Sequence, residues 1–391
     1  MIPRILQLPS DENILLFGPR GTGKTTYLKS LLYFADATYI NLLRAADENR
    51  FLRNPDALAD IAAALPDSAQ HHIIVDEIQK IPKLLDIVHD IIERQNNVKF
   101  ILTGSSARKL KRQGSNLLAG RAFVYDLFAF TFTEIEKQFI LEKALRWGML
   151  PKIIEYDQDG KKQKYLESYT NTYLKEEVWA EQFVRDLSPF QYFLQVAAQS
   201  NGKPINFSKV ARDVGVSDTT VAKYYSILED TLLGFFLYPF QHSFRKRLNK
   251  TPKFYFFDTG IVRALCNKLS LPLLKQTYDY GDAFEHFIIL QCKQLANYYH
   301  SEYRFSYIRT KDDAEIDLIV ERPGKNPLFI EIKSNEDVRA DQLKTLQAMA
   351  ASFSNCEPIC FSCDPYAKKT NGILVLPWQQ GIRQYFGESA E

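Results

Sequence analysis

The stretch Gly18-Pro19-Arg20-Gly21-Thr22-Gly23-Lys24-Thr25-Thr26 contains the pattern G-x-x-x-x-G-K-[ST] and decides the fold of the first part of the chain. It follows the apolar segment NILLF (13–17) and leads into a helical pattern, TTYLKSLLYF (25–34). A glycine-rich loop between a strand and a helix can turn successive backbone N–H groups toward a phosphate, and the helix N-terminus adds its positive end. We therefore predict that residues 18–26 bind the phosphates of a nucleotide.

The same motif predicts the chemistry of the nucleotide site. We expect Lys24 to reach the β- and γ-phosphates of ATP and the Thr25 hydroxyl to bind Mg²⁺. A second apolar run ends in Asp76 and Glu77; Asp76 is expected to complete the Mg²⁺ shell, and Glu77 to polarise the attacking water. Thr103, at the end of the next strand pattern, is either a sensor of the γ-phosphate or a helix cap.

Apolar, β-branched runs alternate with helical patterns over the first 130 residues. The runs are NILLF (13–17), ATYINL (37–42), HHIIVDE (71–77), VKFILTGS (98–105) and AFVYDLF (122–128). Such alternation predicts an α/β fold in which βα units build a parallel sheet buried on both faces.

These motifs and strands resemble the AAA+ group of the P-loop ATPases. The resemblance implies an ATPase domain over residues 1–132, with ATP and Mg²⁺ as cofactors, and a homo-oligomer in the form of a ring. It also implies that a neighbouring subunit contributes an arginine to the site, for which Arg108 and Arg121 are the candidates.

The length of the chain limits the number of its domains, and its net charge limits how it could bind nucleic acid. The chain has 391 residues, which at about 100–200 residues per domain predicts two to four domains. Its 49 Lys and Arg against 47 Asp and Glu leave a net charge of +2, so the surface is not basic as a whole. Nucleic acid would have to bind at local patches, and the densest basic runs are residues 108–112 and 245–250.

The longest apolar segment, residues 232–240, is far shorter than the roughly 20 residues of a membrane-spanning helix. The first residues also lack the apolar stretch of a signal peptide. We therefore expect a cytoplasmic protein with no membrane partner and with reduced thiols. The alternative for the thiols is an iron–sulfur cluster held by Cys292, Cys356, Cys360 and Cys363.

Residues 133–200 carry a helical, aromatic pattern without strand-like alternation, which predicts a helical lid or connector. The segment 207–230 then has the spacing of two helices joined by a tight turn, with the small Ala211 at the crossing and Gly215 in the turn. This spacing resembles the helix-turn-helix, which implies a DNA-binding module over residues 201–265.

A winged version of that module is indicated by the apolar segments LLGFFLYPF (232–240) and FYFFD (254–258). The basic run between them, residues 244–250, would be a wing that contacts phosphates. The second helix nevertheless offers only Lys223 and few donors that could read bases. The module therefore fits two partners equally well: DNA bound without sequence preference, and another protein.

The last part of the chain places charged residues inside apolar strand patterns. Asp317 lies in EIDLIV, and Glu331 and Lys333 lie in LFIEIKS, where a period of two puts them on one face. Charges in such positions are costly unless they share a function. We expect Asp317 and Glu331, with Glu285 from the preceding helix, to bind one or two Mg²⁺ or Mn²⁺ ions, and Lys333 to orient water or stabilise charge at phosphorus.

This order of acids and lysine resembles the PD-(D/E)xK nuclease superfamily, which implies an α/β domain over residues 278–391. The order of domains resembles a widespread prokaryotic group of ATPases, with which the chain also shares the fragments LAGR (118–121), WGMLP (147–151), YTNTYLKE (169–176) and FDTG (257–260). The resemblance implies an ATPase whose nucleotide state controls a domain that binds or cleaves DNA. The alternative is a signalling or scaffold ATPase whose winged helix and nuclease-like domain only bind partners.

Overall fold

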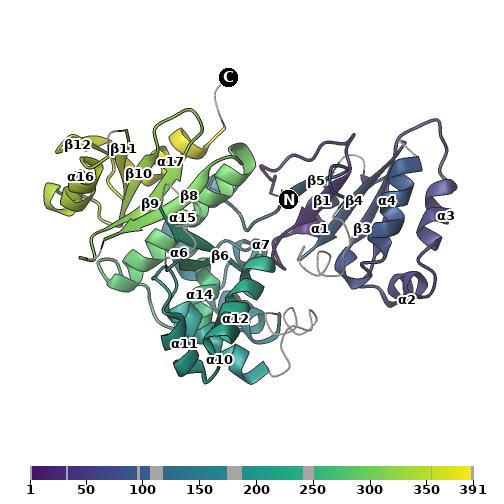
Figure 1. Ribbon diagram of the computed structural model, residues 1–391, viewed down its shortest axis with the longest axis horizontal. Helices are drawn as coiled ribbons and strands as arrows, with labels where there is room; N and C mark the ends of the chain where they lie inside the picture. The colour runs from purple at the N-terminus through teal and green to yellow at the C-terminus, as the bar shows by residue number, and fades with distance from the viewer. Residues whose placement is uncertain are drawn as a thin grey trace. The chain divides into compact units, whose positions relative to one another are not determined.

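The computed structural model describes residues 2–31, 34–94, 97–105, 118–173, 187–240, 251–310, 312–353 and 355–388 (Figure 1). The chain forms two compact units. The first comprises Met1–Phe130 with the short segments Leu150–Lys152 and Ser226–Leu233, and the second comprises the remainder. Arg108 and the basic runs at 108–112 and 244–250 lie outside the described residues.

The first unit contains a five-stranded, wholly parallel sheet in the order β2-β3-β4-β1-β5. Its strands are β1 (Ile14–Phe17), β2 (Thr38–Asn41), β3 (His71–Asp76), β4 (Val98–Gly104) and β5 (Phe123–Asp126). Each lies within the run predicted for it, so the α/β fold with a parallel sheet is confirmed. The expected burial on both faces holds for the central strands only, because Phe123 and Val124 of the edge strand β5 are more than half exposed.

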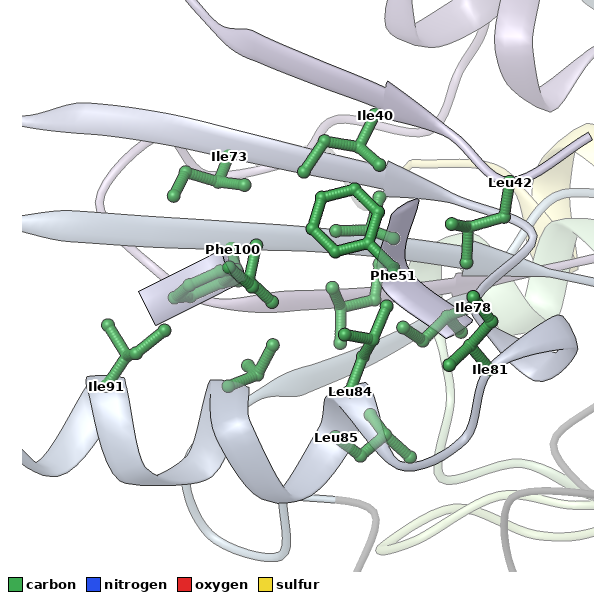
Figure 2. Packing of buried hydrophobic residues seen from close by; sticks show 14 of the residues in the cluster. Ile40, Leu42, Phe51, Ile73, Ile78, Ile81, Leu84, Leu85, Ile91 and Phe100 are labelled. Atoms are coloured by element: carbon green, nitrogen blue, oxygen red, sulfur yellow. The ribbon is translucent and has the colours of Figure 1, made fainter. Parts of the chain in front are cut away.

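The helices of this unit cover the sheet with apolar faces. They are α1 (Lys24–Leu28), α2 (Ala45–Arg53), α3 (Ala57–Ala63), the 3₁₀ turn η2 (Ile78–Lys80) and α4 (Leu84–Arg94). Leu84, Val88 and Ile91 recur at helical spacing on α4 and are buried. Figure 2 shows the apolar side chains of α4 directed at the strands that carry Ile73 and Phe100.

The helix after the phosphate-binding loop is shorter than predicted. The pattern 25–34 predicts one helix, but α1 ends at Leu28. The hydroxyl of Ser30 donates a 2.6 Å hydrogen bond to the carbonyl of Tyr27, and the N–H groups of Ser30 and Leu31 bond three residues back. A serine that bonds to nearby backbone in this way competes with helix continuation, so the chain tightens into turns.

Residues 133–200 contain helices and no strand in the parts that the structure describes, as predicted. The wider middle region, up to residue 265, adds the strands at 234–239 and 253–256. Its helical elements are η3 (Glu136–Gln138), α6 (Leu141–Trp147), α7 (Pro151–Glu155), α8 (Asp159–Ser168), the π-helix η4 (Tyr169–Tyr173), α10 (Leu187–Gln199), α11 (Phe207–Val214), α12 (Asp218–Asp230) and α14 (Thr259–Leu265).

The predicted pair of helices with a tight turn lies at α11 and α12. Gly215 ends α11 with φ +77°, and its N–H donates to the carbonyl of Ala211. Ser217 precedes α12 and accepts a 3.2 Å hydrogen bond from the N–H of Thr220. Val221, in the first turns of α12, is fully buried.

The second unit contains an eight-stranded sheet in the order β12-β13-β11-β10-β9-β8-β6-β7. Its strands are β6 (Gly234–Pro239), β7 (Lys253–Phe256), β8 (Arg304–Arg309), β9 (Glu315–Glu321), β10 (Leu328–Lys333), β11 (Glu357–Ser362), β12 (Lys368–Thr370) and β13 (Ile373–Pro377). The hairpin β6–β7, expected as the wing of a separate module, joins the C-terminal sheet because β6 pairs in parallel with β8. The strands β11, β12 and β13 follow the Glu-x-Lys strand β10.

Three helical segments accompany this sheet. They are α15 (Tyr278–Tyr299), η5 with α16 (Ala340–Leu343 and Lys344–Ala350) and α17 (Trp378–Phe386). α15 begins at Tyr278, because the Thr277 hydroxyl accepts a hydrogen bond from the N–H of Tyr280 and caps the helix there.

A matched pair of substitutions tests the core of the first unit. Phe51 is 1% exposed among the side chains of Figure 2, whereas its neighbour Leu52 is 56% exposed. Phe51→Ala is expected to lower the free energy of unfolding by about 3–5 kcal/mol because it leaves a cavity. Leu52→Ala should change it by less than about 0.5 kcal/mol. Urea unfolding measures both; equal effects would contradict this packing.

Candidate nucleotide site and C-terminal charged cluster

The phosphate-binding loop runs from the end of β1 to the start of α1, as its motif predicts. Gly21 and Gly23 have backbone φ angles of +83° and +92°, which residues other than glycine adopt only with strain. A Cβ atom on Gly18 would lie 2.3 Å from the carbonyl oxygen of Leu127. The glycines therefore allow both the turn of the loop and its close approach to the segment after β5.

Lys24 is buried at the start of α1, with its ammonium group directed back into the loop. Its Nζ donates hydrogen bonds to the carbonyl oxygens of Gly18 (2.6 Å) and Pro19 (3.3 Å). The hydroxyl of Thr22 also donates to Pro19 (2.9 Å), which fixes the same turn. Of the remaining loop residues, Arg20 and Thr26 occupy exposed positions.

Asp76, at the end of β3, is the centre of the site. Its Oδ2 accepts hydrogen bonds from the hydroxyls of Thr25 (2.9 Å) and Tyr39 (2.7 Å), and its Oδ1 accepts one from Thr103. The structure thus brings together the predicted residues Thr25, Asp76 and Thr103. Thr103 lies at the end of β4, where its hydroxyl donates to Asp76. Its assignment as a sensor of the γ-phosphate or as a helix cap stays a prediction.

Sequence reasoning missed Tyr39. It comes from β2, which pairs with β3, and burial followed by the hydrogen bond to Asp76 raises the pKa of its hydroxyl. The hydroxyl therefore stays protonated and acts as a permanent donor to the carboxylate. An aromatic residue in the strand before the Asp-Glu strand is a weak signal, because the sequence does not show that the two strands pair.

Glu77 has a left-handed backbone (φ +63°) directly after β3. Its N–H donates to the hydroxyl of Thr103 (3.3 Å), and its carboxylate accepts a hydrogen bond from the side-chain amide of Gln79. The same amide nitrogen donates to Ser105 (3.1 Å). Gln79, which sequence reasoning also missed, therefore holds the carboxylate of Glu77 from within the turn η2.

Of the two candidate arginines, only Arg121 lies within the described residues. Its guanidinium is 2.5 Å from a carboxylate oxygen of Glu93 and lowers the pKa of that carboxyl group. The assignment of either arginine to a neighbouring subunit's site stays a prediction.

The second unit brings Asp317, Glu331 and Lys333 together on neighbouring strands. Lys333 Nζ lies 2.5 Å from Oε1 of Glu331, and Oδ2 of Asp317 accepts a 2.7 Å hydrogen bond from the N–H of Ile332. Glu331 is 5% exposed, and its Oε2 is buried with no hydrogen-bond partner among the described residues. The period-two expectation for β10 agrees with this arrangement.

Glu285, the predicted third acid, lies on α15 and contacts two residues that sequence reasoning missed. It accepts a 2.7 Å hydrogen bond from the hydroxyl of Tyr255 and lies 3.5 Å from Nζ of Lys253. Lys253 also pairs with Glu315 of β9. A signal existed, since Lys253 and Tyr255 alternate with phenylalanines in β7 as the acids alternate with apolar residues in β9 and β10.

The carboxylates of this cluster lie close enough to shift one another's pKa. Burial, then the charges of Glu331 and Glu285, raise the pKa of Asp317 well above its usual range. Burial also raises the pKa of Glu331. Burial lowers the pKa of Lys333, but the charges of Asp317 and Glu331 outweigh it and the net shift is upward. Across the described ranges, no three or more His, Cys, Asp or Glu side chains are grouped so as to hold a metal ion together.

The cysteines are free thiols. Cys292 and Cys360 are buried, and burial raises the pKa of both. Cys360 lies in β11 in register with Glu331 of β10. The two buried thiols therefore pack in the interior. Among the described residues, no three or more side chains are grouped to bind an iron–sulfur cluster.

Family models match three successive parts of the chain. Residues 10–136 match a family described as AAA domain. Residues 138–272 match a Domain of unknown function (DUF8612), and residues 280–380 match another (DUF4143). The first part of the chain therefore carries a P-loop domain of the AAA type, the class of nucleotide-binding domain that its loop and sheet define. The middle match spans the regions predicted as connector and winged helix.

Curated relatives match most of the chain at low identity. An uncharacterized protein of Mycobacterium tuberculosis is 28% identical over 322 residues, covering 82% of this chain and 70% of the relative. An uncharacterized protein of Methanocaldococcus jannaschii is 24% identical over 437 residues, covering 97% and 86%. The similarity therefore extends well beyond the AAA domain.

Solved structures give weaker likenesses. A DNA polymerase III gamma subunit-related protein of Thermotoga maritima has a TM-score of 0.28 at 10% identity and covers 57% of this chain and 94% of its own. PCH-2 of C. elegans has a TM-score of 0.23 at 15% identity and covers 57% and 61%. At these scores neither likeness carries an argument about function.

Within the part of the chain that the structure describes, no helix combines the length and the apolar composition needed to cross a membrane.

Substitution of Tyr39 tests the hydrogen bonds at Asp76. Tyr39→Phe removes one donor to a charged acceptor and should lower the free energy of unfolding of the nucleotide-free protein by about 1.5–3 kcal/mol. Tyr125→Phe, on β5 of the same sheet, is the matched control and should leave stability unchanged. Urea unfolding of both variants measures the difference, and an unchanged midpoint for Tyr39→Phe would show that the bond contributes nothing.

Proposed function

We propose that the first unit binds ATP with Mg²⁺ and hydrolyses it. The observation that carries this proposal is the convergence of Thr25, Thr103 and Tyr39 on the carboxylate of Asp76, beside a P-loop of the AAA type. Bound Mg²⁺ would neutralise charge on the phosphates. The hydroxyl of Thr25 and the carboxylate of Asp76 are oxygen ligands of the kind it prefers, so the residues present fit this ion.

The other residues of the site would act on the nucleotide and on water. Lys24 would exchange its two carbonyl acceptors for phosphate oxygens, because an ammonium group bonds more strongly to an anion than to a neutral carbonyl. Glu77 would accept hydrogen bonds from the attacking water once Gln79 releases its carboxylate. Thr103 would then remain the hydroxyl that links Asp76 to the backbone of Glu77.

Two substitutions separate binding from hydrolysis. Glu77→Gln should keep ATP affinity and lower turnover by about 10²–10⁴-fold, because the group that polarises water is lost. Lys24→Ala should weaken ATP binding itself. Lys29→Ala, an exposed lysine just after α1, is the matched control and should behave as wild type. Calorimetry with ATP and a phosphate-release assay measure the two properties; wild-type turnover in Glu77→Gln would refute the assignment.

For the C-terminal cluster we propose a divalent metal site that serves phosphodiester binding or cleavage. Its support is the buried oxygen of Glu331 that lacks a donor, next to Asp317 and the ammonium group of Lys333. An anionic oxygen buried without a donor is costly unless a cation binds it, so the residues fit Mg²⁺ or Mn²⁺. Lys333 would stabilise negative charge at phosphorus. The nucleotide state of the first unit would control this domain.

The helices α11 and α12 support a partner-binding role, with DNA and protein as the two candidates. Ala211 and Val221 pack inside, while the exposed Lys223 is the one lysine that α12 presents. The scaffold alternative, in which these parts bind without cleavage, rests on this sparse set of donors. The domain bounds 1–132, 133–200, 201–265 and 278–391 and the homo-oligomeric ring stay predictions.

Cleavage assays decide between the two roles. Wild-type protein with Mg²⁺ or Mn²⁺ should nick plasmid or shorten linear DNA. Asp317→Ala should reduce this activity by more than the about 10–100-fold that is typical when a residue supporting a metal ligand is lost, because Asp317 is itself a proposed ligand. Asp312→Ala, an exposed acid before β9, should retain it. Cleavage that persists in Asp317→Ala would exclude the proposed site, while no cleavage by wild type would favour the scaffold role.

A further inference from the structure

Lys253 is a lysine buried inside the C-terminal charged cluster. Its side chain is 3% exposed, and its ammonium group pairs with Glu315 and lies 3.5 Å from Glu285. The ring of Tyr307 lies 5.1 Å from the same nitrogen. A buried ammonium group is stable only where anions compensate for the water it has lost, and these two carboxylates do so here.

The cluster therefore has two halves. In one half, the carboxylates of Glu285 and Glu315 already have partners: the hydroxyl of Tyr255 donates a hydrogen bond to Glu285, and the ammonium group of Lys253 pairs with both acids. In the other, Asp317 and Glu331 lie on adjacent strands, and the Oε2 atom of Glu331 has no donor among the described residues.

We propose that Lys253 is a fixed internal cation that takes the place of a second metal ion, so that the cluster holds one divalent ion, between Asp317 and Glu331. This inference rests on the metal site proposed for the cluster and narrows it. It assigns Glu285 to the lysine rather than to the metal.

Charge balance supports a single ion. Fully ionised, the carboxylates of Glu285, Glu315, Asp317 and Glu331 carry four negative charges, and the ammonium groups of Lys253 and Lys333 carry two positive ones. One divalent ion neutralises the remainder, and a second would leave an excess of positive charge in a largely buried place. Arg309, 3.9 Å from Glu315, makes a second ion still less favourable.

Geometry supports the same assignment. A metal ion bound by Glu285 would have to displace the hydroxyl of Tyr255 and leave Lys253 with Glu315 alone. By contrast, an ion at Oε2 of Glu331 breaks no described hydrogen bond. Mg²⁺ and Mn²⁺ keep several water ligands and are commonly held by one or two carboxylates, so two acids suffice.

Counting bound Mn²⁺ by electron paramagnetic resonance tests the proposal. We would use the full chain without nucleotide, carrying Asp76→Asn so that the ATP site holds no ion. One Mn²⁺ per chain is expected. Adding Glu331→Gln should remove it, and adding Glu285→Gln should leave it bound with less than a threefold change in affinity. A count of zero or two, or loss of the ion with Glu285→Gln, would overturn the proposal.

Substitution of Lys253 is expected to increase the number of bound Mn²⁺ ions. Lys253→Met should raise the count from one to two, because Glu285 and Glu315 lose their cation. Lys203→Met, an exposed lysine 3.7 Å from Asp282, is the matched control and should keep one. A folded Lys253→Met that still binds one ion contradicts the proposal; if circular dichroism shows it unfolded, the comparison of Glu285→Gln with Glu331→Gln decides.

DNA cleavage measured on the same samples separates this inference from the proposed nuclease role. One bound ion without cleavage removes the nuclease role and leaves the assignment of Lys253 intact. Cleavage with two bound ions supports the nuclease role and overturns the assignment of Lys253.

Discussion

The carboxylate of Asp76 is the constraint on which the first unit's site depends. It accepts hydrogen bonds from Thr25 of α1, Tyr39 of β2 and Thr103 of β4, so one side chain links β3 to the two strands beside it and to the helix that follows the phosphate-binding loop. Asp76 and Thr103 meet because the parallel strands β3 and β4 bring their carboxyl ends to one edge of the sheet. Each hydroxyl also offsets the cost of burying the charge, and a nucleotide-bound ion would enter a place already arranged around an anion.

The sequence predicts those parts of this site that have a local pattern. The glycines, Lys24 and Thr25 are recognisable because the loop's conformation needs them at fixed spacing, and Asp76 because it ends an apolar strand. Tyr39 and Gln79 have no such signature. Tyr39 meets Asp76 only because β2 pairs with β3, and Gln79 meets Glu77 only because the left-handed backbone of Glu77 folds the chain into η2. Long-range pairing and single turns of this kind are not visible in periodicity.

In the second unit, residues 147–149 and the fragment FDTG (257–260) show how close packing explains residues that a pattern cannot. Asp258 caps α14 and accepts a 2.7 Å hydrogen bond from the N–H of Met149. A Cβ on Gly148 would lie 1.9 Å from the Asp258 carboxylate, and one on Gly260 would lie 2.1 Å from the carbonyl of Trp147. The two backbones approach so closely that only glycine fits at both positions, and burial raises the pKa of Asp258 to about 6.

The hairpin β6–β7 likewise brings into the charged cluster a residue whose partners no local pattern predicts. Period two predicts the common face of Glu331 and Lys333 within one strand, but Lys253 reaches Glu315 from 62 residues earlier, through the pairing of β6 with β8. The lysine belongs to the segment matched at 138–272 and its acids to the segment matched at 280–380. Because a buried ammonium and its carboxylates stabilise one another only as a set, neither segment can complete this cluster alone. The charged cluster therefore depends on both matched regions, because the first contributes the ammonium group of Lys253 and the second contributes the carboxylates that pair with it.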